Sequence, residues 1–235
     1  MADIPPKQQT SRIIIAIDGP AGAGKSTVAS RLANRLGIPY LDTGAMYRAV
    51  ALLALRDGLE PPLDEHASRR VRELMERHRI EVETRDGATS VLVDGHDVGE
   101  DIRSPECSLM ASAVSALAEV RSALVPLQRQ LGLHKGGVME GRDIGTVVFP
   151  DADLKVYLTA SVDVRALRRL GDLRERGIDT SLEEVREQQQ QRDLRDTSRA
   201  QSPLQVARGS VVVDTSGLTL DEVVERLLKE VARIR

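Results

Sequence analysis

The sequence predicts an α/β fold of three layers, in which helices cover both faces of a central parallel sheet. Short apolar strand patterns alternate with longer helical patterns along most of the 235 residues. The first such unit is the clearest, because a β-branched run at 13–17 leads into a helix whose apolar residues recur every four positions: Val28, Leu32 and Leu36. Such alternation is typical of a parallel sheet with helical crossovers.

The turn between that strand and that helix fits the phosphate-loop pattern G-x-x-x-x-G-K-[ST] of P-loop NTPases. Its glycines let consecutive backbone N–H groups turn toward an anion, and the helix dipole points to the same place. Lys25 would bridge the outer phosphates of a bound polyphosphate, and the Ser26 hydroxyl would bind Mg²⁺. A plain strand-to-helix turn is the alternative. The predicted nucleotide contacts are Gly19, Pro20, Ala21, Gly22, Ala23, Gly24, Lys25, Ser26 and Thr27.

The next elements continue the same alternation. Gly37 is a natural end for the first helix, an extended piece follows at 38–41, and a second helix is expected at 45–53 with Thr43 near its cap. Tyr47 and Arg48 fall in the first turns of that helix, where ligands of open α/β sheets collect. The alternative for Arg48 is a solvated surface charge, which the spacing alone does not exclude.

A change of period marks residues 62–103. A charged amphipathic helix is expected at 64–78, and from Ile80 apolar and polar residues alternate with turns at Asp86-Gly87 and Asp94-Gly95. We therefore expect an inserted α+β subdomain that contains a small antiparallel meander.

The chain then returns to the main pattern. Helices are expected from Pro105 to about residue 117 and over 119–131, followed by strands at 138–140 and 154–158. Ser161 then caps an arginine-rich helix.

Residues 164–203 carry most of the arginines that could act on a phosphate. The basic piece 172–176 lies between Gly171 and Gly177 and is expected to form a short mobile lid, with a solvated charged loop as the alternative. Ser181 and Glu184 predict a capping box that opens a long polar helix. Three of its residues share one face, and these are Arg192, Asp196 and Arg199. A strand at 211–213 and a helix at 220–234 complete the pattern.

Composition argues against several classes of partner. The net charge of −3 and the scarcity of aromatic residues give no general reason to bind nucleic acid. Cys107 is the only cysteine, which excludes an internal disulfide and favours a reducing compartment. The longest apolar run, 49–55, is too short to cross a bilayer. We expect a cytoplasmic monomer with no membrane partner.

Two nucleotide-binding classes fit poorly. A guanine-nucleotide switch needs an Asn-Lys-x-Asp stretch, and the only asparagine is Asn34 in the first helix. A motor ATPase would need a strand that ends in an acidic pair, whereas the strand at 211–213 is followed by the lone Asp214.

Four ordered motifs carry a more specific resemblance. The stretches DGPAGAGKST at 18–27, LDTGAMYR at 41–48, GRDIGTVVFP at 141–150 and RDLRDTSR at 192–199 together resemble bacterial cytidylate kinase, the type 1 CMP kinase of the P-loop nucleoside monophosphate kinase family. The resemblance runs from residue 13 to the last helix. It implies a P-loop NTPase three-layer fold in a single kinase domain, 1–235. That domain would comprise a core (12–61, 104–163 and 204–235), an inserted monophosphate-binding subdomain (62–103), and a lid with its following helix (164–203).

The resemblance also implies an activity and a set of roles. The enzyme would transfer the γ-phosphoryl group of ATP to CMP or dCMP, giving ADP and CDP or dCDP, in pyrimidine nucleotide metabolism and with Mg²⁺. Thr43, Tyr47 and Arg48 would line the monophosphate site, and Ser112, Arg121 and Asp143 would contact the cytosine. Arg142 would hold the acceptor phosphate, and Asp196 would bind the ribose with support from Arg192 and Arg199. The catalytic set would be Lys25, Arg142 and Arg192. A phosphate-loop kinase for another small acceptor, or an ATP-dependent switch that binds RNA or protein, remains the alternative.

Overall fold

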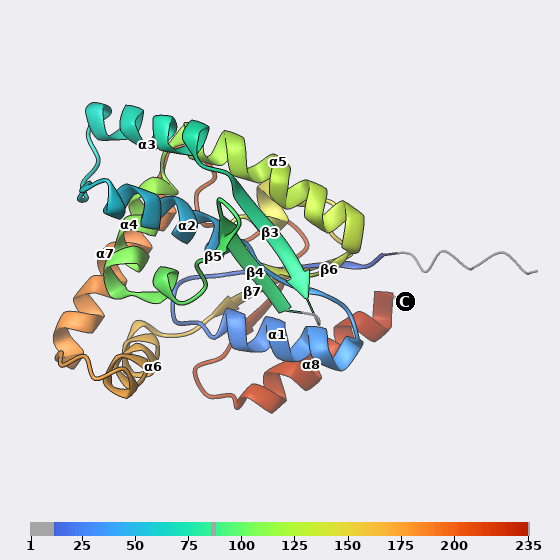
Figure 1. The fold of residues 1–235 in the computed structure, drawn as a ribbon. Helices are drawn as coiled ribbons and strands as arrows, with labels where there is room; N and C mark the ends of the chain where they lie inside the picture. Colours follow the sequence, from blue (N-terminus) through green and yellow to red (C-terminus); the bar gives the residue numbers. More distant parts are fainter. Residues whose placement is uncertain (1–11, 86–87, 235) are drawn as a thin grey trace, which may run out of the picture.

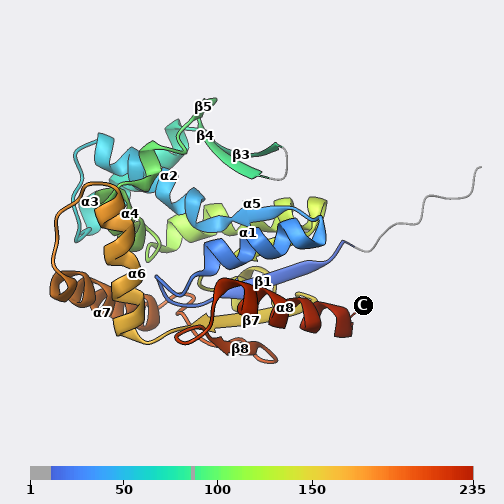
Figure 2. The ribbon, with the colours of Figure 1, turned by 90° about the horizontal axis from the view of Figure 1, so that it is seen from below.

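The computed structural model describes residues 12–85 and 88–234. Its main sheet has five strands in the order β2-β6-β1-β7-β8, and every neighbouring pair is parallel. The strands are β1 (Ile14–Asp18), β2 (Tyr40–Asp42), β6 (Gly137–Glu140), β7 (Leu154–Thr159) and β8 (Val211–Asp214). The predicted parallel sheet is therefore confirmed (Figures 1 and 2).

Alternate side chains of the central strand β1 face two different layers. Ile15 and Ile17 pack in one cluster with α1 (Lys25–Leu36) and α8 (Leu220–Ile234), which lie side by side in both views (Figures 1 and 2). Ala16 packs in another cluster with residues of α5 (Ala118–Lys135) and of the short π-helix η2 (Ile144–Val148). This period-2 separation gives the three layers that the sequence predicts.

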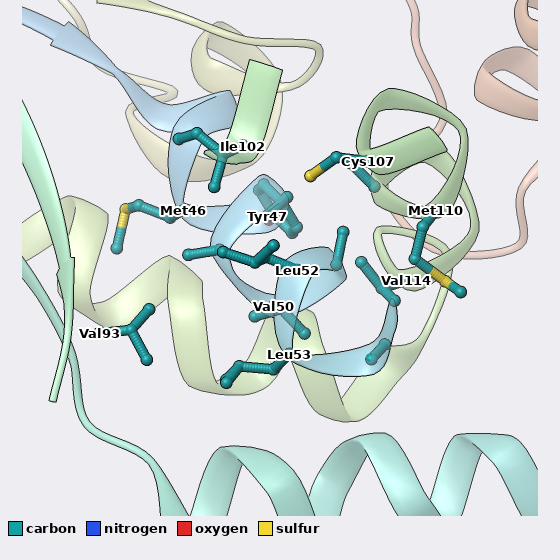
Figure 3. Close-up of a cluster of buried hydrophobic side chains, with 14 of the residues drawn as sticks. Met46, Tyr47, Val50, Leu52, Leu53, Val93, Ile102, Cys107, Met110 and Val114 are labelled. Carbon is teal, nitrogen blue, oxygen red and sulfur yellow. The ribbon is translucent and has the colours of Figure 1, made fainter. Parts of the chain in front are cut away.

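A second hydrophobic core lies beside the sheet. It joins α2 (Thr43–Arg56) and α4 (Pro105–Val114) to α3 (Glu65–Arg77) and to the antiparallel sheet β3 (Ile80–Arg85), β4 (Ala88–Val93) and β5 (His96–Asp97). Figure 3 shows its side chains gathered around α2. The short 3₁₀ turn η1 (Asp101–Arg103) contributes Ile102. The expected meander is present, and its Asp86-Gly87 turn lies outside the described residues. The apolar packing extends beyond 62–103 because it includes α2 and α4.

Helix α2 begins at Thr43, so the expectation that Thr43 lies near its cap is confirmed. The side chain of Asp42 accepts a 3.1 Å hydrogen bond from the backbone N–H of Ala45, which makes Asp42 the N-cap. The Thr43 hydroxyl instead donates to the backbone oxygen of Glu140 at 2.6 Å. Thr43 therefore ties the start of α2 to the end of strand β6.

The basic piece 172–176 is not a loop bounded by two glycines. Helix α6 (Val162–Glu175) continues through Gly171, and Arg176 is its C-cap. Leu170 and Leu173 are buried against Val185 of α7 (Leu182–Ser198), and this packing keeps the last turn helical. Figure 2 shows α6 and α7 together at the end of the molecule toward which the main strands run.

The predicted capping box of α7 is confirmed, since Ser181 and Glu184 bond each other's backbone N–H groups. In the described ranges no single helix has the length and apolar character of a membrane span. Helices α4 and α5 reach that length and composition only as a pair, across a bend of 99°.

Candidate active site

A cleft of about 600 Å³ opens beyond the carboxyl ends of β1, β2 and β6. Nine cationic and five acidic side chains line it, so it favours anionic ligands. Its volume lies in the usual range for small-molecule sites. The predicted residues that line it are Ala21, Gly22, Gly24, Lys25, Ser26, Thr27, Thr43, Tyr47, Arg48, Ser112, Arg121, Arg142, Asp143, Arg192, Asp196 and Arg199.

Of the predicted phosphate-loop residues, Gly19, Pro20 and Ala23 do not line this cleft. Gly19 has φ 146, and a Cβ there would fall 1.9 Å from the backbone oxygen of Leu158 in β7. Its lack of a side chain therefore serves the close approach of the loop to the neighbouring strand as well as the turn itself.

Lys25 lies at the floor of the loop, 6% exposed, and its Nζ donates to the backbone oxygen of Pro20 at 2.7 Å. Burial, reinforced by the positive charge of Arg142, lowers the pKa of Lys25 to about 7. A polyphosphate in the cleft would oppose both effects, because its negative charge favours the ammonium form. Lys25 is thus placed to respond to a phosphate ligand.

Glu140, which the sequence reading did not single out, lies beside the phosphate loop. It ends β6, which is the strand next to β1, and is 4% exposed. The Tyr40 hydroxyl donates to its Oε1, and the Ser26 hydroxyl lies near the same carboxylate. Burial and the nearby Asp42 raise the pKa of Glu140. The only sequence signal was an acidic residue at the end of a short predicted strand.

The oxygen atoms of Ser26, Glu140 and Asp42 form one polar corner of the cleft. Hydroxyl and carboxylate oxygens, supplemented by water and phosphate oxygens, are the ligands that Mg²⁺ prefers. The donor set on this side of the loop therefore fits a magnesium ion carried by a nucleotide.

Arginines from three segments gather over the middle of the cleft. Arg142 follows β6, and its Nε donates to Asp196 of α7 at 2.9 Å. Arg48 of α2 pairs with Asp42. Burial and the charge of Arg142 lower the pKa of Arg192 to about 10, and the Nε of Arg192 has no hydrogen-bond partner within the described ranges. These guanidinium groups would be well placed to bind phosphate oxygens in two-pronged fashion.

The far end of the cleft holds a buried polar cluster. The Arg121 Nη2 donates to Asp143, and the Arg199 Nη2 lies 3.8 Å from the other oxygen of that carboxylate. The Arg121 guanidinium also lies 5.7 Å from the centre of the Tyr47 ring. Close by, the Ser112 hydroxyl is buried and has no hydrogen-bond partner among the described residues. Four residues from four separate segments, Tyr47, Ser112, Asp143 and Arg199, thus line one pocket although they span 152 positions of the chain.

Helix α6 supplies cleft residues that the predicted site set lacks: Arg168, Arg169, Asp172 and Arg176. Arg168 donates to the side-chain and backbone oxygens of Thr215, at 3.0 and 2.7 Å. Arg176 donates to the backbone oxygen of Arg103 at 2.8 Å and so ties the end of α6 to η1. The visible signal was the arginine-rich composition of the expected lid and following helix, 164–203, from which only Arg192, Asp196 and Arg199 were assigned to the site.

Comparison with known proteins agrees with this arrangement. A family model described as cytidylate kinase matches residues 15–233. The chain is 49% identical over 214 residues to a cytidylate kinase of Desulfitobacterium hafniense (strain Y51), which covers 91% of this chain and 90% of that protein. It is 48% identical to a cytidylate kinase of Carboxydothermus hydrogenoformans, over 93% of this chain and 97% of the relative. With the family model spanning almost the whole sequence, the chain belongs to the cytidylate kinase family.

Proposed function

We propose that the protein transfers the γ-phosphoryl group of ATP to CMP or dCMP and releases ADP together with CDP or dCDP. The observation that carries this proposal is one continuous cleft. It joins the phosphate loop around Lys25 to the buried Arg121–Asp143 pair, with Arg142 and Arg192 between them. A donor and an acceptor nucleotide that shared this cleft would meet with their phosphates among the arginines.

The acceptor phosphate itself supplies the attacking oxygen, so the transfer needs no covalent protein intermediate. The γ-phosphoryl group carries negative charge on its oxygens in the transition state. Catalysis therefore depends on aligning the two nucleotides and neutralising that charge. We assign these tasks to Lys25, Arg142 and Arg192. Arg142 would hold the acceptor phosphate, while Asp196 fixes its guanidinium through the 2.9 Å bond from Nε.

Cytosine has an amino donor beside ring and carbonyl acceptors. A carboxylate and a guanidinium that lie side by side complement that edge, and Asp143 with Arg121 provides this combination. We place the base against these two residues, with the unpartnered Ser112 hydroxyl as a third polar contact. Thr43, Tyr47 and Arg48 would line the monophosphate, and Asp196 and Arg199 would meet the ribose.

Magnesium would bind at the corner formed by Ser26, Glu140 and Asp42. When bound with ATP it would neutralise part of the phosphate charge. Within the chain, Ser26 offers its hydroxyl, and Glu140 would orient bound water because its carboxylate is fixed by Tyr40.

We propose that two parts of the chain close over the bound nucleotides. One is the inserted subdomain, 62–103, together with the helices that share its core; the other is the lid, 164–203. The Arg176 bond to the Arg103 backbone oxygen joins the two and would exclude water from the transfer. We further propose that the enzyme acts in the cytoplasm as a monomer, without nucleic acid.

An ADP-release assay tests the function with CMP, dCMP, UMP, AMP and no acceptor in parallel. We expect strong stimulation by CMP and dCMP and only slow release without an acceptor. Lys25→Met should abolish turnover while CMP binding, measured by calorimetry, is retained. ATP hydrolysis whose rate does not depend on CMP but increases with RNA would support an ATP-dependent switch instead. Stimulation of ADP release by AMP alone would indicate a different acceptor.

A further inference from the structure

Ser202 lies in the loop after α7 and has an unusual backbone conformation. In the described part of the chain, the non-glycine residues with positive φ are Asp94 (φ 52) and Ser202 (φ 50). Asp94 precedes Gly95 in the tight turn between β4 and β5, where this conformation is common. Ser202 precedes Pro203 and belongs to no such turn. A left-handed serine persists only where its surroundings hold it, so its contacts call for an explanation.

Those contacts go to two arginines of the acceptor end of the cleft. The Arg121 Nε donates to the Ser202 hydroxyl at 3.2 Å, and the Arg199 Nε donates to the Ser202 backbone oxygen at 2.6 Å. Arg121 comes from α5, whereas Arg199 is the C-cap of α7. One residue therefore holds the inner N–H group of both guanidinium groups.

The outer nitrogens of the same two arginines point to Asp143. Arg121 donates through Nη2 to one carboxylate oxygen, and the Arg199 Nη2 lies 3.8 Å from the other. Each guanidinium is planar and rigid, so fixing Nε also fixes the direction of the Nη groups. Ser202 thus determines how the pair is presented to a ligand beside Asp143.

The loop is itself anchored to α7. The backbone N–H of Leu204 donates to the Asp196 backbone oxygen at 2.7 Å, and the Leu204 side chain is 5% exposed. Because both ends of the turn are tied to the last turn of α7, the hydroxyl of Ser202 has a defined position relative to Arg199.

An uncharged hydrogen-bond acceptor is well suited to the Nε groups of Arg121 and Arg199. Arg121 and Asp143 are each 4% exposed, and burial lowers the pKa of Arg199 despite the neighbouring Asp143. A second carboxylate would compete with the ligand for the guanidinium groups, whereas leaving a buried N–H unpaired would be unfavourable. A hydroxyl and a backbone oxygen satisfy both Nε groups, so the Nη groups can face Asp143 and a ligand beside it.

We propose that Ser202 is a positioning residue that sets the affinity for the acceptor nucleoside by orienting Arg121 and Arg199 around Asp143. This inference rests on the proposed function, because it takes the Arg121–Asp143 end of the cleft as the base site. Ser202 acts through the arginines and touches no reacting atom.

The test uses the full-length enzyme and ADP release, with CMP varied at saturating ATP and then ATP varied at saturating CMP. Ser202→Ala removes one hydrogen bond to a charged donor, so we expect the KM for CMP to rise about five- to tenfold. We expect kcat and the KM for ATP to stay within about twofold, since the phosphate loop is untouched.

Ser202→Gly separates the hydroxyl from the backbone, because glycine adopts positive φ readily. Equal increases in the KM for CMP in the alanine and glycine variants assign the effect to the hydroxyl. A normal KM in the glycine variant would overturn that assignment. Ser122→Ala is the matched control on α5, where the hydroxyl donates to its own helix at Ala118 on the exposed face, and it should behave as wild type.

A double-mutant cycle supplies the decisive comparison. Lysine has no Nε–H at the guanidinium position, so Ser202→Ala in an Arg121→Lys background should raise the KM for CMP no further. Additive effects, or a loss of kcat with equal changes in both KM values, would overturn the positioning role. If the wild type releases ADP equally with and without CMP, the proposed function fails. If it responds to CMP but Ser202→Ala does not differ from it, only this inference fails.

Discussion

The Asp18 carboxylate accepts a 2.7 Å hydrogen bond from the backbone N–H of Gly145. Its other oxygen accepts from Ile144 at 2.8 Å. Asp18 is the last residue of β1 and directly precedes the phosphate loop, whereas Ile144 and Gly145 follow Arg142 and Asp143. One buried carboxylate therefore joins the phosphate loop to the loop that carries Arg142 and Asp143, the residues proposed to contact the acceptor.

Asp18→Asn should weaken this link. An amide offers one acceptor oxygen and turns an N–H₂ group toward the second backbone donor, so one hydrogen bond is lost. We expect a higher KM for CMP at pH 7, because the loop that carries Arg142 and Asp143 loses one of its two hydrogen bonds to Asp18. ADP release with CMP varied at saturating ATP measures this effect. An Asn variant with the wild-type KM would contradict the assigned link.

The same residue predicts a pH dependence. Burial raises the pKa of Asp18 to about 6, above its ordinary value of 3.8. Between those values the folded protein binds a proton that the unfolded chain does not, so the contribution of Asp18 to the free energy of unfolding falls as pH rises. The unfolding free energy of the wild type minus that of the Asp18→Asn variant should therefore decrease by up to about 3 kcal/mol between pH 4 and pH 6. Above pH 6 this difference should stay constant. A pH-independent difference would refute the raised pKa.

Asp193→Asn tests the anchoring of the lid to the phosphate loop. Arg165 is 3% exposed and bonds both carboxylate oxygens of Asp193, while its Nη1 also donates to the Ala21 backbone oxygen at 3.2 Å. Removing the charge leaves a buried guanidinium poorly paired. We expect a loss of about 2–3 kcal/mol in the free energy of unfolding and a higher KM for ATP.

The control for that variant lies between the same two helices. Asp163 of α6 pairs with Arg186 of α7 at 3.0 Å, with 68% and 43% of the side chains exposed. Asp163→Asn should change the unfolding free energy by less than about 0.5 kcal/mol, because water screens exposed pairs. Equal losses in both variants would show that burial of Arg165 does not decide the effect.

Gly19→Ala tests the close approach of the phosphate loop to β7. The added Cβ would lie 1.9 Å from the Leu158 backbone oxygen at a φ of 146, so either the loop or the strand must move. We expect a loss of about 3 kcal/mol or more in unfolding free energy together with weaker ATP binding. Gly171→Ala is the control, because Gly171 lies within α6 and an added Cβ would meet no atom of another segment within 4 Å. That change should stabilise by about 0.5–1 kcal/mol. A tolerated Gly19→Ala would contradict the clash.

Glu140→Gln tests the magnesium corner. Glutamine keeps the shape and the acceptor for Tyr40 but removes the negative charge beside Ser26. We expect kcat to fall about tenfold or more and the Mg²⁺ concentration for half-maximal rate to rise, because residues that orient a metal's ligands have effects of that size. A titration of ADP release against Mg²⁺ measures both. An unchanged Mg²⁺ dependence would remove Glu140 from this role.

The parts of the structure that follow from the sequence are those fixed by neighbouring residues. The phosphate loop is one, because Gly24, Lys25 and Ser26 stand between a β-branched strand and an amphipathic helix. The capping box of Ser181 and Glu184 is another. Both depend on hydrogen bonds and periodicity within a few positions of the chain.

The features that escaped prediction depend on contacts between distant segments. Glu140 is significant only because β6 lies next to β1, an order that no local pattern encodes. Ser202 meets Arg121 across 81 positions of the sequence. Helix α6 continues through Gly171 because Leu173 packs on Val185 of α7, so tertiary packing overrides the helix-breaking tendency of glycine.

Transfer of a phosphoryl group between two nucleotides in the cleft is tested by following a radioactive label from the γ-phosphate of ATP in a rapid-quench experiment with CMP. We expect the label to appear in CDP at the rate of ADP release, with none retained on the protein. Label that appears in inorganic phosphate at the same rate with and without CMP would contradict it.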